Sequence, residues 1–131
     1  MANSSRPLSP FLSVYKLEPS MVMSGLHRIT GFALTVGLLL LTWWLVAAAA
    51  GPDYFAVVQW LLGTWIGKLA LIGWTFSIFY HLGTGIRHLG FDLGYGLSKA
   101  GIDASGWTVA FFSAGMTVVT WIISFIALGV K

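Results

Sequence analysis

The sequence predicts an all-α membrane protein with three transmembrane helices, because it is strongly apolar and its few charges leave three long stretches free. Of its 131 residues, 57% are hydrophobic and 8% are charged, so polar side chains cannot cover a water-soluble globule. The mean hydropathy of +0.85 agrees. An aromatic content of 15% is typical of proteins whose Trp and Tyr side chains lie at membrane interfaces. Lipid is therefore the expected solvent for most of the chain.

Each predicted span is long enough to cross a bilayer. About 20 apolar residues, at roughly 1.5 Å per residue, cover a hydrocarbon core of roughly 30 Å. Residues 29–50, 65–86 and 107–130 meet this requirement. We expect residues 1–20 to form an N-terminal segment outside the membrane and residues 21–131 to form one anchor domain.

The connections differ in composition from the spans. Gly51-Pro52-Asp53 is a turn signal, and residues 54–60 after it suit the membrane interface. Residues 90–106 contain five glycines and three charges, which predicts a loop. Three spans place the termini on opposite sides, and Lys and Arg are more frequent on the side of the N-terminus. This asymmetry predicts a cytoplasmic N-terminus.

Composition also excludes several classes of function. The net charge of +3 comes without a run of Lys or Arg, so we expect no nucleic-acid partner. The absence of Cys excludes a disulfide framework and an iron–sulfur cluster held by this chain alone. The sequence contains no Ser-His-Asp arrangement, paired carboxylates or phosphate loop, so we predict no catalytic residue. The first 20 residues lack a secretory or transit pattern, which favours the bacterial inner membrane over the alternative, the mitochondrial inner membrane.

A first group of polar residues precedes the first span. Ser24, His27 and Arg28 stand at i, i+3 and i+4, so they are predicted to share one helix face. A hydroxyl, an imidazole and a guanidinium can donate hydrogen bonds to a quinone carbonyl or a haem propionate. The alternative is that His27 and Arg28 anchor the helix at lipid phosphates, and spacing does not decide between them.

A second group lies at the end of the second span. His81, Gly85 and His88 stand at i, i+4 and i+7 on one face, with His81 about 9 Å deeper than Arg87. Neutral imidazole is a good axial ligand for haem iron, and a glycine one turn away leaves room for the macrocycle. A histidine hydrogen-bonded to another helix is the alternative. If haem is bound, His88 cannot supply the second axial ligand from the same face, so another chain must do so.

Two ordered blocks resemble the family of succinate dehydrogenase cytochrome b556 subunits, the large membrane anchor of respiratory complex II. The first is Arg6-Pro7-Leu8-Ser9-Pro10, then Tyr15, then Met23-Ser24-Gly25-Leu26-His27-Arg28-Ile29-Thr30-Gly31. The second is His81-Leu82-Gly83-Thr84-Gly85-Ile86-Arg87-His88-Leu89 with Asp92-Leu93-Gly94. Phe91 differs from the Trp that some mitochondrial members have before this Asp.

The resemblance implies a four-subunit enzyme of the tricarboxylic acid cycle and aerobic electron transport. A flavoprotein would oxidise succinate, an iron–sulfur subunit would pass electrons to ubiquinone, and this chain would pack with a small anchor subunit into a helix bundle. The chain would then act only as a subunit of the enzyme and would have no activity toward succinate by itself.

The resemblance also implies roles for particular residues. His81 matches the axial ligand of a haem b shared with the small anchor, and Ser24 and Arg28 match quinone-binding residues. His27 and Arg28 match haem propionate contacts, and His88 lies in the haem vicinity. Two alternatives remain, which are the anchor of a quinol:fumarate reductase and a structural membrane subunit without a cofactor.

Overall fold

In this computed structural model, the described residues are 14 and 16–129, and they form four helices. These are α2 (Pro19–Ala50), α3 (Pro52–Gly63), α4 (Trp65–Asp92) and α5 (Lys99–Leu128). Helices α2, α4 and α5 are long and apolar enough to cross a membrane, which confirms the all-α class and three candidate spans. The N-terminal motif at residues 6–10 and Tyr15 lie outside the described residues.

Local sequence explains where the helices begin and end. Gly51 has φ +128°, a conformation that glycine adopts without a Cβ penalty, and it separates α2 from α3. The side chain of Thr64 accepts a hydrogen bond from the Gly67 N–H and caps α4. Ser98 caps α5 in the same way through the Gly101 N–H. A few polar residues and glycines therefore set the boundaries between the helices.

The helices are longer than the sequence predicted. Helix α2 begins ten residues before the predicted span at residue 29, and the predicted interfacial segment at residues 54–60 is part of α3. The predicted loop at residues 90–106 is wrong for most of its length, since only residues 93–98 lie outside the helices. The Ser98 cap starts a helix despite the glycines that follow it, and Gly94 and Gly96 provide the positive φ angles of the short loop.

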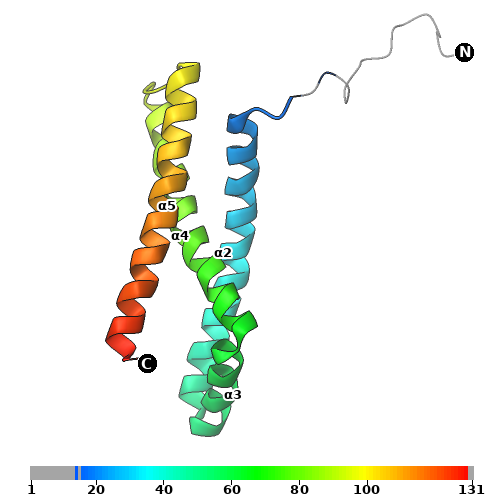
Figure 1. The fold of residues 1–131 in the computed structure, drawn as a ribbon. Helices are drawn as coiled ribbons and strands as arrows, with labels where there is room; N and C mark the ends of the chain where they lie inside the picture. The colour runs from blue at the N-terminus through cyan, green and yellow to red at the C-terminus, as the bar shows by residue number, and fades with distance from the viewer. Residues whose placement is uncertain (1–13, 15, 130–131) are drawn as a thin grey trace, which may run out of the picture.

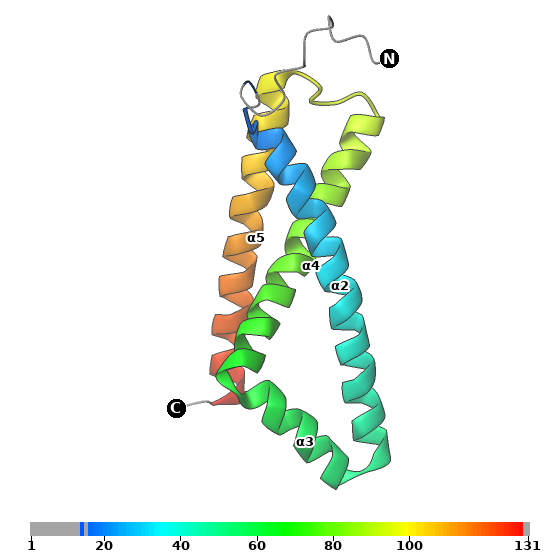
Figure 2. The same cartoon turned by 90° about the vertical axis from the view of Figure 1, so that its right-hand side faces the viewer.

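Helix α4 is central, because it packs against both α2 and α5. Figure 1 shows that α2 begins, α4 ends and α5 begins at the same end of the bundle, and in Figure 2 α2 crosses α4. We call this half the polar end; it comprises residues 18–30, 80–92 and 99–109. The other half, the apolar end, comprises residues 37–79 and 113–128. In the most apolar stretches of α2, α4 and α5, only 11%, 17% and 11% of the residues are buried. Most apolar side chains of the spans can therefore contact lipid or other chains.

Candidate functional site

Three histidines of α2 and α4 stack at the polar end. The His27 ring lies 4.0 Å from the His81 ring at an interplanar angle of 8°, and 5.2 Å from the His88 ring at 27°. His27 and His81 are half-buried, whereas His88 is exposed. The two helices that carry the predicted histidines therefore bring all three rings together.

The backbone fixes the tautomers of the two α4 histidines. His81 Nδ1 lies 3.2 Å from the carbonyl oxygen of His27, and His88 Nδ1 lies 2.7 Å from that of Thr84. Since a carbonyl oxygen only accepts hydrogen bonds, each Nδ1 must carry the proton and donate it. In a neutral ring with this tautomer, Nε2 keeps its lone pair, which is the form of imidazole that binds a metal.

Two buried threonines complete the cluster. The Thr84 hydroxyl lies 2.6 Å from His27 Nδ1, and the Thr30 hydroxyl lies 3.3 Å from His81 Nδ1. Both hydroxyls also donate to carbonyl oxygens of their own helices. Sequence analysis missed these two residues, although each stands three residues after a histidine and so shares its face.

Glycines control the space around His81. A Cβ atom at Gly31 would lie 3.0 Å from His81 Cε1, so this glycine allows the ring to approach α2 closely. A Cβ atom at Gly85 would meet nothing within 4 Å. The space beside Gly85 is therefore open in this chain, and its predicted role in accommodating a macrocycle stays a prediction.

The cluster fits a haem ligand better than a metal site made by this chain alone. Within residues 14 and 16–129, no group of three or more His, Cys, Asp or Glu side chains could hold a metal ion, and the histidines stack instead of converging. A single imidazole with its Nδ1–H held by a carbonyl and its Nε2 available is the donor chemistry of an axial haem ligand. His81 meets this requirement.

Ser24 and Arg28 share a hollow on the surface of α2. Both side chains are exposed and line a hollow of about 430 Å³ with Leu17, Ser20 and Gly25, whereas His27 contacts α4. The structure thus divides the predicted polar face into two. Ser20, one helical turn before Ser24, adds a hydroxyl that sequence analysis missed.

Arg87, close to His88 in sequence, belongs to a different contact. Its Nε donates to the Ser105 hydroxyl at 2.9 Å, and its Nη2 donates to the carbonyl of Ile102 at 2.8 Å. Its guanidinium also lies 4.5 Å from the Phe91 ring centroid. Arg87 therefore joins α4 to α5 and does not contribute to the histidine cluster.

Three apolar spans, a histidine cluster between two of them and a hollow lined by Ser24 and Arg28 define the class as a helical membrane protein with polar side chains gathered at one end of its bundle. Comparison with known proteins makes this specific. Residues 2–123 match the model of the "Succinate dehydrogenase/Fumarate reductase transmembrane subunit" family. The chain belongs to this family, and it is a membrane-anchor subunit of an oxidoreductase complex, respiratory complex II.

Individual relatives agree over nearly the whole chain. The chain is 42% identical over 122 residues to a succinate dehydrogenase cytochrome b556 subunit of Paracoccus denitrificans, which covers 93% of this chain and 94% of that protein. It is 39% identical over 119 residues to the subunit of the same name in Rickettsia felis, covering 91% and 93%. A mitochondrial cytochrome b560 subunit of Sus scrofa is 38% identical over 111 residues, covering 81% and 64%. The three spans and the bacterial relatives support a location in the bacterial inner membrane.

Proposed function

We propose that this chain holds one side of a haem b and forms part of the site where ubiquinone is reduced. The observation that carries the proposal is the division of one segment of α2. His27 contacts the histidines of α4, whereas Ser24 and Arg28 line the hollow on its other side. Helix α2 would therefore contribute side chains to both the haem site and the quinone site.

His81 is the proposed axial ligand through Nε2. The His27 carbonyl would hold the ring by accepting its Nδ1–H, and the Gly31 backbone would limit its position from one side. His27 and His88 would lie in the vicinity of the haem, and a histidine of the small anchor subunit would supply the other ligand. Haem b, when bound, supplies a one-electron store close to the hollow.

Ser24 and Arg28 are the proposed quinone-binding residues. Their side chains are exposed in one hollow and can donate hydrogen bonds to a quinone carbonyl oxygen. As electrons arrive from the iron–sulfur subunit, negative charge develops on that oxygen, and the Arg28 guanidinium would stabilise it. Succinate itself would be oxidised at the flavoprotein subunit, so this chain has no activity toward succinate alone. The N-terminus and the hollow would then face the cytoplasm.

Substitutions in the hollow test the quinone assignment. We expect Arg28→Leu to lower the succinate:quinone reductase activity of the purified complex by at least about tenfold, because a charge-assisted hydrogen bond is lost, and Ser24→Ala by about fivefold. Succinate oxidation with a soluble artificial acceptor should stay unchanged. Lys16→Leu, which removes a cation at the same end but outside the hollow, should change neither activity. Equal loss of both activities in the Arg28 and Ser24 variants would contradict the assignment.

A spectrum tests the haem assignment separately. The reduced complex should show a b-type absorption band that His81→Leu removes, because the iron loses an axial ligand. His88→Leu should retain the band, since its ring cannot reach the opposite side of the same iron. A band that survives in His81→Leu would exclude His81 as ligand, and absence of any band in the unmodified complex would favour a structural subunit without a cofactor.

The matching family also contains fumarate reductase subunits, which favours one second candidate. In a fumarate reductase, a quinol would be oxidised in the same hollow and the complex would reduce fumarate. Extraction of the quinone that co-purifies with the complex distinguishes the two. Ubiquinone supports the first proposal, and menaquinone supports the second.

A further inference from the structure

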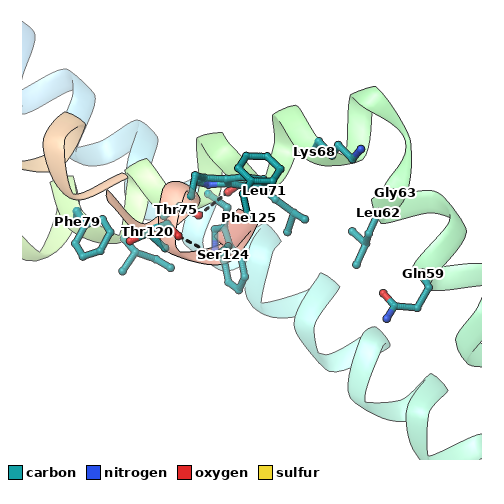
Figure 3. A pocket seen from close by; sticks show the side chains of 13 residues that line it. Gln59, Leu62, Gly63, Lys68, Leu71, Thr75, Phe79, Thr120, Ser124 and Phe125 are labelled. Carbon is teal, nitrogen blue, oxygen red and sulfur yellow. Dashed lines mark hydrogen bonds between the residues drawn. The ribbon is translucent and has the colours of Figure 1, made fainter. Parts of the chain in front are cut away.

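A groove of about 610 Å³ lies at the apolar end, far along the bundle from the histidines. It runs along α4 and is closed on one side by the last turns of α5 (Figure 3). Figure 3 shows Lys68 and Gln59 at one extremity of the groove and Phe79 at the other. Its walls are mainly apolar, so the groove fits a mainly apolar occupant.

The hydroxyls of the walls offer little to a polar ligand. Thr75 donates to the Leu71 carbonyl, and Ser124 donates to the carbonyl of Thr120, each at 2.8 Å. Thr120 itself donates to a carbonyl of its own helix at 2.8 Å. The Trp74 Nε1 atom is buried against Gly37 and is inaccessible from the groove. The body of the occupant is therefore expected to be hydrocarbon.

One extremity of the groove is polar. Lys68 is exposed in the first turn of α4, and within the described part of the chain no carboxylate lies within ion-pair distance of it. The exposed amide of Gln59 lies at the same extremity (Figure 3). A cation and an amide at the end of an apolar groove favour an occupant with one anionic end.

The length of the groove matches one leaflet of a bilayer. Phe79 follows Lys68 by eleven positions along the helix, which corresponds to a rise of roughly 16 Å. This is about half of a hydrocarbon core of roughly 30 Å. An acyl chain that starts at the membrane surface would therefore extend along the whole groove.

We propose that the groove binds an anionic phospholipid. Its phosphate contacts the Lys68 ammonium and the Gln59 amide, and one acyl chain lies between α4 and α5. This site is separate from the proposed haem and quinone sites, which lie at the polar end.

Photo-crosslinking tests the proposal on the intact four-subunit complex. The complex is reconstituted in phosphatidylcholine vesicles that contain a trace of either phosphatidylglycerol or phosphatidylcholine with a photoreactive acyl chain. We expect the phosphatidylglycerol probe to label peptides covering residues 68–79 and 116–125 about fivefold more than the phosphatidylcholine probe, as expected for one lysine contact with an anionic lipid. Lys68→Gln should remove this preference, and Lys16→Gln should preserve it.

A second variant tests the apolar part. Ser124→Trp should fill the groove and lower labelling by both probes, whatever their headgroup. Equal labelling by both probes in the unmodified complex, or an unchanged preference in Lys68→Gln, would overturn the proposal. Absence of labelling of these peptides by both probes would also overturn it, because the groove would then hold no lipid.

Discussion

The two ends of the bundle are held together by different forces. At the polar end, side chains of one helix bond to the next, as in His27 with Thr84, Arg87 with Ser105 and Lys99 with Glu18. Among the described residues of the apolar end, the hydroxyls bond within their own helix or at its cap, as in Thr117 with the carbonyl of Ser113.

The positions of the helices are therefore specified more closely at the polar end than at the apolar end. Directional bonds fix the relative positions of α2, α4 and α5 around the histidines, as a ligand site requires. At the apolar end, close packing such as Trp74 on Gly37 is the main contact between helices. In the described part of the chain, the helices there are held by packing without side-chain hydrogen bonds between them, and the groove between them is the proposed lipid site.

The largest loss of stability is expected from a substitution that disturbs helix packing at the apolar end. A Cβ atom at Gly37 would collide with the half-buried Trp74 indole, so Gly37→Ala should destabilise the complex by about 1–3 kcal/mol. The measurement is the thermal unfolding midpoint of the purified complex. Gly73→Ala is the matched control, because a Cβ atom there meets nothing within 4 Å. Equal midpoints for the two variants would show that the Trp74 contact does not hold the helices.

A smaller loss of stability is expected when a buried threonine is replaced by valine, and the loss should differ between the two ends. Thr84→Val leaves His27 Nδ1 without its partner and should cost about 1 kcal/mol. Thr117→Val removes only a bond within α5 and should cost less than about 0.5 kcal/mol. Thermal unfolding of both variants checks this order, and a larger loss for Thr117→Val would reverse the comparison of the two ends.

The smallest effect is expected at the surface of the polar end. Lys99 and Glu18 form an ion pair at 2.9 Å, but their side chains are 73% and 55% exposed. Water and salt screen such a pair. We therefore expect Lys99→Gln to leave the unfolding midpoint unchanged at physiological ionic strength, and a clear decrease would show that this contact matters to the polar end.

The sequence predicted the spans and histidines well because each depends on local chemistry. Uncharged runs identify helices α2, α4 and α5, and the i, i+4, i+7 spacing placed His81 and His88 on one face. The extent of α5 was missed because glycines near Gly101 suggested a loop, whereas the Ser98 cap starts a helix there.

Contacts between helices could not be predicted from one helix at a time. Spacing placed Ser24, His27 and Arg28 on one face, but the position of α4 decides that His27 turns inward. For the same reason Thr30, Thr84 and Gly31 were not recognised, since their importance depends on where His81 lies. The haem and quinone roles themselves stay predictions.

Two consecutive residues on α2, His27 and Arg28, can show whether this helix serves haem with one face and quinone with another. In the purified complex, the reduced haem spectrum and the quinone reductase activity are measured for Arg28→Leu and His27→Leu. Arg28→Leu should lower the reductase activity at least tenfold and leave the haem band in place, whereas His27→Leu should shift the haem band and largely preserve the activity. If both variants change both readouts to the same extent, the two faces of α2 do not serve haem and quinone separately.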